Sequence, residues 1–345
     1  MPEDFRNQFS QDISEVISGC HRELELLLRG KVLVTGGGGF VGRWLVTTLA
    51  NASHEFSVSG SVTSLSRTTP KWQADLVKDG LLSVVNHDLR YPLQISKEYS
   101  CVFHCAVPAS AELNVQDPEL MQSTIEEGTQ NVINHFEGTK ARIVNVSSGA
   151  VYGTQPPDKF CLEEEWVESP LHQLPESAYH RGKFNAEKML NASVLRGDID
   201  AVHARLFAFL APHLPLDSHF AAGNFLSDAK NGRRVRVRGD GRTLRSYMYG
   251  TDLAIWLFKV AVSGQLGRSY NIGSPFPVSI FDLAQLVTAI SGCPSPVDEI
   301  APADSGVFVH RYIPCTHRIE RELGVRLSIN LEQAIRRTLK WLRET

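Results

Sequence analysis

Tyr179 and Lys183 stand four residues apart in the stretch Tyr-His-Arg-Gly-Lys. On a helix, positions i and i+4 share one face, so both side chains can point into the same site. A phenol with a pKa of about 10 is a poor base at neutral pH, and a nearby ammonium group favours the phenolate. The pair therefore predicts general acid–base chemistry at a carbinol or carbonyl oxygen, with Tyr179 carrying the proton.

Ser148 supplies a second hydroxyl upstream of this pair. It follows the apolar run from Ile143 to Val146, which predicts a buried strand. Open α/β sheets bind their ligands beyond the carboxyl ends of the strands, where Ser148 would lie. We expect Ser148 to hydrogen-bond the substrate oxygen and to share its proton with Tyr179.

A glycine-rich turn near the start of the chain predicts a dinucleotide site. The short apolar run 31–34 precedes Gly36, Gly39 and Gly42, and helical spacing of apolar residues begins at Phe40 and Val41. Glycines between a strand and a helix let the backbone approach a pyrophosphate at the helix N-terminus. We expect these five residues to contact a nicotinamide cofactor, which would carry hydride to or from the substrate.

Together the three motifs resemble the extended short-chain dehydrogenase/reductase family of nucleotide-sugar epimerases and dehydratases. The resemblance extends over about residues 30–343. It implies an α/β fold, with a Rossmann-like doubly wound parallel sheet and a smaller C-terminal substrate-binding lobe. It also implies Ser148, Tyr179 and Lys183 as catalytic residues, with Lys183 also on the nicotinamide ribose, and a nucleotide sugar as the substrate.

The end of the second predicted strand bears on the choice of cofactor. Many NAD enzymes carry an acidic residue there, on the ribose 2′-hydroxyl, whereas this chain has Ser66 and Arg67. Arg67 suits a 2′-phosphate, which favours NADP over NAD, although a solvated Arg67 would leave NAD open. The resemblance adds Asp88 and Leu89 at the adenine and Ala106 beside the cofactor.

His104 precedes that last segment and invites a catalytic interpretation. A lone buried histidine is more often a hydrogen-bonded core residue than a catalytic group. We therefore expect His104 to be structural.

The resemblance continues in the second half of the chain. Asn224 matches a turn that contacts the substrate pyrophosphate, Arg238 precedes a glycine at a position that stacks on the nucleotide base, and Arg245 matches an arginine that meets the phosphates. A guanidinium group can stack on a base or bind phosphate through two parallel hydrogen bonds. One departure from the family pattern is Ala208, where asparagine is usual.

The residue types at Gly149 and Ala150 restrict the reactions that this chain could catalyse. In the family that this chain resembles, the 4,6-dehydratases carry an Asp-Glu pair at these two positions. The UDP-glucuronate decarboxylases of that family carry a Glu at the second position. Neither residue of this chain can transfer a proton. The pattern favours an NADPH-dependent 4-ketoreductase of deoxysugar synthesis, with a 4-epimerase holding NAD as the alternative. A dehydratase, or a cofactor-sensing protein without catalysis, fits less well because the acids are missing and the Ser-Tyr-Lys set is intact.

Alternating strand and helix patterns indicate how these residues are positioned. We expect an N-terminal helical extension over 1–29, formed by one amphipathic helix that packs on the main body rather than on a partner. An NAD(P)-binding domain over 30–207 would be rejoined by 245–273, and 208–244 and 274–345 would form the substrate lobe. The strands are predicted at 31–35, 61–65, 82–86, 101–104 and 142–147, and the helices at 40–51, 71–79 and 118–136.

Composition agrees with an ordinary globular enzyme. The 345 residues are 42% hydrophobic and 21% charged, with a net charge of -3, so no general attraction to nucleic acid or membrane is expected. The six cysteines include no Cys-x-x-Cys pair, the histidines form no metal-like cluster, and no apolar run is long enough to span a bilayer. We expect reduced thiols, no metal, a cytoplasmic location and a homodimer.

Overall fold

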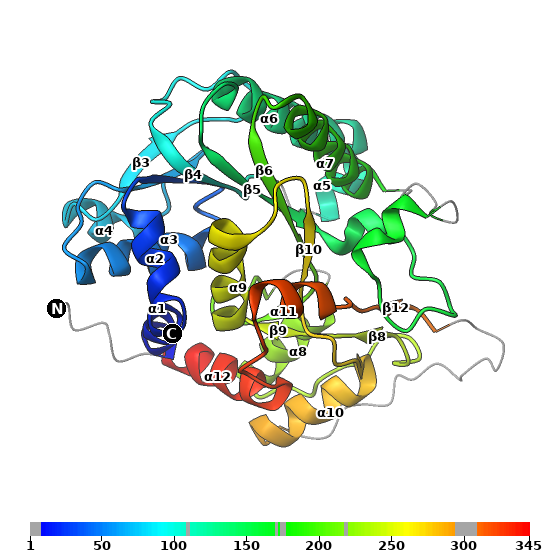
Figure 1. Ribbon diagram of the computed structural model, residues 1–345. Coiled ribbons are helices and arrows are strands. Elements are labelled where there is room, and N and C mark those ends of the chain that lie inside the picture. The colour runs from blue at the N-terminus through cyan, green and yellow to red at the C-terminus, as the bar shows by residue number, and fades with distance from the viewer. Residues whose placement is uncertain (1–7, 108–110, 170–171, 173–176, 217–219, 294–308) are drawn as a thin grey trace.

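The computed structural model describes residues 8–107, 111–169, 172, 177–216, 220–293 and 309–345. Its centre is a seven-stranded parallel sheet in the order β10-β6-β5-β4-β1-β2-β3 (Figure 1). The strands are β1 (Lys31–Thr35), β2 (Val62–Ser66), β3 (Ser83–Asn86), β4 (Tyr99–His104), β5 (Arg142–Ser148), β6 (Asp200–Leu206) and β10 (Ser269–Ile272). The predicted doubly wound α/β sheet is confirmed, since the order reverses between β1 and β4.

The two faces of the sheet follow from strict alternation along each strand. Leu33 and Val102 pack on one side, against α6 (Pro118–Phe136) and α7 (Ala178–Arg196). Val34 and Phe103 pack on the other side, against α3 (Phe40–Glu55) and α9 (Gly250–Ser263). Because neighbouring residues of a strand point to opposite faces, an unbroken apolar run is what a strand covered on both sides requires.

The N-terminal extension forms two helices, not the single helix we expected. α1 (Gln8–Gly19) and α2 (His21–Leu28) are interrupted at Cys20, whose φ of -141° is not helical. The apolar periodicity runs through the break, so the pattern could not show it. Both helices pack against α3 and α9, and α1 also packs against α12 (Leu331–Glu344), so within the described residues the extension packs on its own chain.

Shorter elements fill the connections. The helix expected at 71–79 is a 3₁₀ turn followed by one short helix, and a further short helix precedes α6. These connecting elements are η1 (Lys71–Gln73), α4 (Ala74–Lys78), α5 (Ala111–Gln116), η2 (Gly149–Tyr152) and η3 (Glu164–Glu168).

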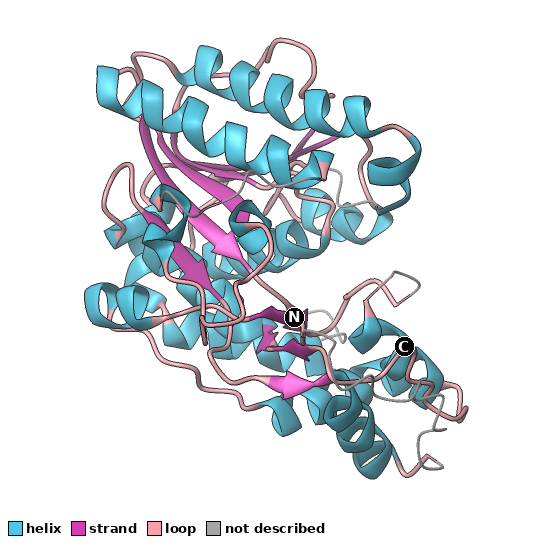
Figure 2. Cartoon of the chain, turned by 90° about the vertical axis from the view of Figure 1, so that its right-hand side faces the viewer, coloured by secondary structure: helices cyan, strands magenta, loops and turns pink. Residues whose placement is uncertain are grey.

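The C-terminal part of the chain contributes a smaller body below the sheet (Figure 2). Its strands are only two residues long and form two small sheets, β11-β8-β12 and β7-β9. The expected return at 245 is therefore too early, because Arg245 ends β8, and the chain rejoins the main sheet through α9 and β10. The elements are β7 (Phe209–Leu210), α8 (Ala221–Lys230), β8 (Leu244–Arg245), β9 (Met248–Tyr249), β11 (Val278–Ser279), α10 (Ile280–Ser291), β12 (Arg311–Tyr312), α11 (His317–Leu323) and α12.

Candidate active site

The carboxyl end of β5 presents two serines to two different surroundings. Ser147 is buried and donates a hydrogen bond of 2.5 Å to Glu187 on α7. Ser148 is partly exposed, and its hydroxyl oxygen accepts a hydrogen bond of 3.1 Å from the Ala150 backbone N–H. Of the two serines, Ser148 is therefore the one that solvent or a ligand can reach.

The first turns of α7 place Tyr179 beside Ser148. Ser177 caps the helix by accepting a hydrogen bond from the His180 N–H, and Asn114 accepts one of 2.8 Å from the Tyr179 N–H. Burial raises the pKa of Tyr179 above its usual value, and a hydrogen bond with Ser148 acts in the opposite direction. The structure therefore brings Tyr179 and Ser148 together, as the sequence predicts.

Lys183 lies one turn further along the same face of α7. Its ammonium group donates a hydrogen bond of 2.6 Å to the Val146 carbonyl. Burial lowers the Lys183 pKa to about 8. Ser148, rather than Lys183, is the described residue that lowers the pKa of Tyr179, which differs from our expectation for the Tyr-Lys pair.

The glycine turn has the geometry of a phosphate cradle. Gly36 has a φ of +68°, and a Cβ there would lie 2.7 Å from the Ala106 backbone, so the turn packs directly on Ala106. A Cβ at Gly42 would lie 2.2 Å from the Gly36 carbonyl oxygen. A Cβ at Gly39 would meet only that same oxygen, at 3.4 Å, so the space in front of Gly39 is free of other protein atoms. Phe40 and Val41 begin α3, directly beyond this turn.

The residues expected at the adenosine lie at the ends of β2 and β3. Arg67 is exposed, whereas the Ser66 hydroxyl donates a hydrogen bond of 2.8 Å to the Thr68 carbonyl. Arg90 holds Asp88 through hydrogen bonds to both carboxylate oxygens, and this contact lowers the pKa of Asp88. Leu89 is buried, and its backbone carbonyl accepts a hydrogen bond from a side chain of α6. Arg67 is therefore more available to a ligand than the Asp88 carboxylate.

His104 is a fully engaged core residue, as the sequence argument predicts. Its Nδ1 lies 3.0 Å from the Thr35 hydroxyl, and its Nε2 lies 3.3 Å from the Thr129 hydroxyl. Burial, together with the charge of Lys183, lowers the pKa of His104 to about 3, so the imidazole is neutral.

The three residues expected to hold the substrate lie in different surroundings. Asn224 lies in the first turns of α8 rather than in a turn of its own, and Arg238 is exposed in an extended segment. Arg245 packs over the ring of Tyr312, with its guanidinium carbon 5.9 Å from the ring centre, and burial lowers its pKa. The structure thus brings Arg245, through Tyr312, to the catalytic end of the sheet.

Tyr312 is a residue of this site that the sequence analysis missed. A Cβ at Gly149 would lie 2.6 Å from the Tyr312 hydroxyl oxygen and 2.7 Å from Cζ of Phe207. The Tyr312 ring lies 4.6 Å from the Phe207 ring, and burial raises the pKa of Tyr312 above its usual value. Nothing in the sequence around Tyr312 marks it, because β12 contains two residues and shows no periodicity.

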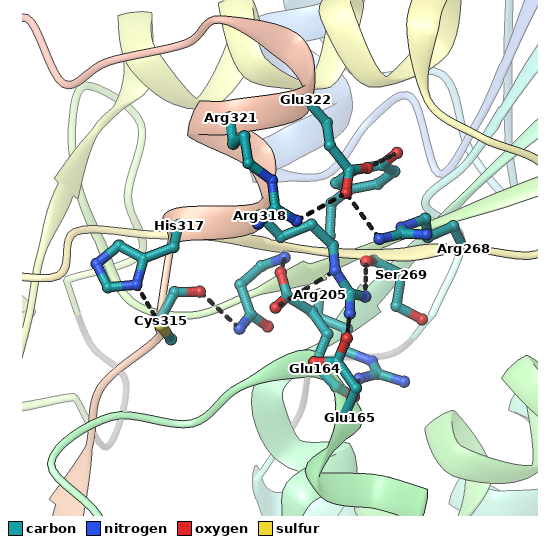
Figure 3. Close-up of polar contacts among 12 residues, drawn as sticks. Glu164, Glu165, Arg205, Arg268, Ser269, Cys315, His317, Arg318, Arg321 and Glu322 are labelled. Atoms are coloured by element: carbon teal, nitrogen blue, oxygen red, sulfur yellow. Dashed lines mark hydrogen bonds and ion pairs between the residues drawn. The ribbon is translucent and has the colours of Figure 1, made fainter.

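Beneath the catalytic end of the sheet lies a buried ion pair. Arg205 donates to both carboxylate oxygens of Glu187, and it also donates to the Tyr152 hydroxyl and the Glu164 carbonyl. Figure 3 shows the surrounding polar contacts, in which Arg318 connects the η3 segment to β10. A cavity of about 540 Å³ lies against these groups, but its lining contains none of the three catalytic candidates.

Among the described residues, no helix is long and apolar enough to cross a membrane. No group of three or more histidine, cysteine, aspartate or glutamate side chains among them is arranged to hold a metal ion.

Comparisons with known proteins agree with this geometry. Residues 32–273 match the NAD dependent epimerase/dehydratase family. The UDP-glucuronic acid decarboxylase 1 of Xenopus tropicalis is 27% identical over 318 residues, which cover 92% of this chain and 73% of that protein.

Two solved structures share the fold. The dTDP-glucose 4,6-dehydratase DesIV of Streptomyces venezuelae, solved with NAD, has a TM-score of 0.75 at 22% identity and covers 91% of this chain and 97% of its own. RMD of Pseudomonas aeruginosa, solved with NADPH, has a TM-score of 0.72 at 20% identity, covering 91% and 99%.

Proposed function

The chain belongs to the NAD dependent epimerase/dehydratase family, within the extended short-chain dehydrogenases/reductases, and on that premise we propose that it reduces a 4-keto nucleotide sugar with NADPH. The substrate would be a nucleotide-activated 4-keto hexose, and the product a nucleotide-activated deoxysugar. Support for simple hydride chemistry comes from the set of groups around Ser148.

The single observation that carries the proposal is the surroundings of Gly149. The space that a side chain would fill there is taken by the hydroxyl of Tyr312 and the ring of Phe207. An acidic side chain, which elimination of water would require at this position, has no room. Hydroxyl groups and the Lys183 ammonium are therefore the proton carriers at this end of the sheet, and they are sufficient for a carbonyl reduction.

Each residue would then have a defined task. NADPH, when bound, supplies the hydride to C4. Tyr179 donates a proton to the C4 oxygen, so that the ketone becomes an alcohol, and Ser148 hydrogen-bonds the same oxygen. Lys183 would hold the nicotinamide ribose, and its proton, whose pKa is lowered to about 8 by burial, is available at neutral pH.

The preference for NADP rests on the exposed Arg67 at the end of β2. The family offers both precedents, since DesIV was solved with NAD and RMD with NADPH. We expect Arg67→Ala to weaken NADPH binding about tenfold, the value of one lost charge-assisted phosphate contact, and to leave NADH binding unchanged. Arg29→Ala, another exposed arginine, serves as the matched control.

Two other activities remain in view. A 4-epimerase would use the same three residues but retain its NAD and return the hydride to the other face of C4. A decarboxylase is suggested by the relatives of 26–29% identity, although the chain carries Ala150 where the family resemblance implies a glutamate for that reaction.

One experiment separates these activities. The purified protein is denatured, the released dinucleotide is identified, and fresh protein is then incubated with nucleotide hexoses, their 4-keto-6-deoxy forms and UDP-glucuronate. The proposal expects NADPH consumption with the 4-keto forms alone. Interconversion of hexose epimers without added cofactor supports the epimerase, release of CO₂ supports the decarboxylase, and either result overturns the reductase.

We also propose the organisation expected from the sequence: a nucleotide-binding part, a C-terminal substrate lobe and a cytoplasmic homodimer. Asn224, Arg238 and Arg245 would contact the substrate nucleotide and its phosphates. Light scattering of the purified protein tests the dimer. Equal turnover of a substrate without its nucleotide diphosphate would contradict the substrate contacts.

A further inference from the structure

A buried glutamine that has no part in the proposed reaction contacts the glycine turn. Gln73 ends η1 and has no exposed surface. Its side-chain nitrogen donates two hydrogen bonds, one of 3.2 Å to the Gly37 carbonyl and one of 2.9 Å to the Ser64 hydroxyl of β2. A single amide group therefore ties the chain after β2 to the glycine turn.

The glycine turn packs closely on β2 and on the chain that follows it, residues 67–73. A Cβ at Gly37 would lie 2.2 Å from the Ser64 hydroxyl oxygen, and a Cβ at Gly38 would lie 2.9 Å from the ring of Pro70. The predicted pyrophosphate motif requires glycine at three other positions. Glycine at these two is explained instead by the close approach of β2 and of the 67–73 segment.

The outer part of the 67–73 segment is also fixed to the sheet. The Thr69 hydroxyl donates a hydrogen bond of 2.8 Å to the Asn86 side chain of β3. The Thr68 carbonyl accepts one of 2.8 Å from the last residue of β2. Arg67, which is exposed, therefore projects from a segment that is held at both ends.

Glutamine is a costly residue for such a buried position. A side-chain amide has two N–H donors and an acceptor oxygen. The nitrogen of Gln73 is engaged as described, but its Oε1 is buried and has no hydrogen-bond partner among the described residues. Core packing alone would favour an apolar side chain of similar size. The benefit of glutamine here therefore lies in the groups that its nitrogen joins.

Those groups would meet two anionic parts of one ligand. The glycine turn is the predicted cradle for the pyrophosphate, and Arg67 is the predicted contact of the 2′-phosphate. In NADP both anions are attached to the adenosine ribose, at its 5′ and 2′ oxygens, so the two protein groups must keep a fixed spacing.

We propose that Gln73 is a positioning residue, which holds the glycine turn and the 67–73 segment at the spacing that NADP requires. This inference rests on the proposed function. A spacing that is set before the ligand arrives lowers the cost of ordering the two segments on binding. NADPH gains most from it because it engages both segments, whereas NADH lacks the 2′-phosphate.

Gln73→Met tests the proposal, because methionine keeps the length of the side chain and removes both hydrogen bonds. We expect the Kd of NADPH to rise about three- to tenfold, the usual value of about one hydrogen bond, and the Kd of NADH to change less than about twofold. Titration of nicotinamide fluorescence measures both. Equal losses for the two cofactors would show that Gln73 supports the glycine turn alone, and would overturn the proposal.

Two further variants control this measurement. Tyr99→Phe removes a buried hydrogen bond of 3.2 Å to Thr63, the neighbour of Ser64 on β2, and should change neither Kd. Ser64→Ala removes only one of the two acceptors of Gln73. It should weaken NADPH binding about two- to threefold, and it carries the same comparison if Gln73→Met does not fold.

A double-mutant cycle shows whether Gln73 acts through Arg67. In an Arg67→Ala background, Gln73→Met should change the Kd of NADPH less than about twofold, because residues that serve one contact are not additive. A full, additive loss in that background overturns the proposal.

Hydrogen exchange of the free protein separates this inference from the proposed function. Gly37 donates its N–H to the Leu65 carbonyl at 3.3 Å, so peptides that contain the glycine turn and residues 67–73 should exchange faster in Gln73→Met. If exchange rises but NADPH binding is unchanged, Gln73 is only structural and the positioning role is wrong. If NADPH binding falls as expected but no 4-keto sugar is reduced, the proposed reaction is wrong and the positioning role stands.

Discussion

Two polar clusters lie on either side of the last two residues of β5, and they differ in how completely their groups are satisfied. Ser147, Glu187 and Arg205 are 3–4% exposed, and the charges of Glu187 and Arg205 are paired in a bidentate contact. Ser148 and Tyr179 are partly exposed, and their hydroxyls carry protons that can move. One cluster fixes the position of α7, and the other can exchange protons with a substrate.

One face of α7 contributes side chains to both clusters. Tyr179, Lys183 and Glu187 follow one another at intervals of four residues, so one helical stripe serves both clusters. Burial alone would raise the pKa of Glu187, but Arg205 outweighs it and holds that pKa below its usual range. Burial lowers the pKa of Lys183, whose hydrogen bond goes to a backbone carbonyl. A charge is therefore stable in the first cluster and costly beside the second.

The largest expected effect breaks the open cluster. Tyr179→Phe keeps the ring and removes only the oxygen that transfers the proton, so turnover should fall about 10²–10⁴-fold while cofactor still binds. Initial rates of NADPH consumption and cofactor titration measure the two quantities. Equal losses of turnover and of cofactor binding would instead indicate that the phenol is structural.

Breaking the closed cluster should act on stability. Glu187→Ala leaves Arg205 buried without its partner, and we expect the free energy of unfolding to fall by about 3–5 kcal/mol. Denaturant titration measures this change. Glu332→Ala, which removes an exposed ion pair with Arg336, should cost less than about 1 kcal/mol. Similar losses of unfolding free energy in the two variants would show that the buried ion pair of Glu187 contributes no more to stability than the exposed one.

The effect of Lys183 on the free energy of unfolding depends on pH, which tests the comparison between the two clusters. Its folded-state pKa of about 8 lies below the unfolded value of 10.5, so the penalty for the buried charge is complete below pH 8 and vanishes as pH rises toward the unfolded value. Without cofactor, Lys183→Met should therefore raise stability at neutral pH by on the order of 3 kcal/mol, and this gain should disappear in alkali. Thermal melts across pH test the trend, and a gain that persists in alkali would contradict it.

The two serines form a matched pair with the smallest expected effects on stability. Ser147→Ala removes a hydrogen bond to a charged carboxylate, which should cost about 1.5–3 kcal/mol and leave turnover near the wild-type rate. Ser148→Ala should lower turnover by on the order of tenfold or more and change stability by less than about 1 kcal/mol. If both variants lose the same property, the division of β5 into two clusters is wrong.

Local pattern was enough to predict most of the nucleotide-binding half. The strand positions and α6 agree with the expected ranges to within about two residues, as element boundaries allow. The long, buried strands carry continuous apolar runs, and the glycine spacing fits a turn whose geometry only glycine allows. The structural role expected for His104 also agrees with its buried position, in hydrogen-bond contact with Thr35 and Thr129.

The sequence by itself determined the sheet, the glycine turn and the shared helix face of Tyr179 and Lys183, because each depends on neighbours a few residues apart. The tertiary structure decided the break at Cys20, the proton that Lys183 loses near pH 8, and the arrival of Tyr312 beside Gly149. β8 and β12 are too short to show a period, and they lie far apart in the sequence, so their pairing depends on how the chain between them folds. The residues that complete the site are therefore set by distant contacts and by burial, neither of which a local pattern contains.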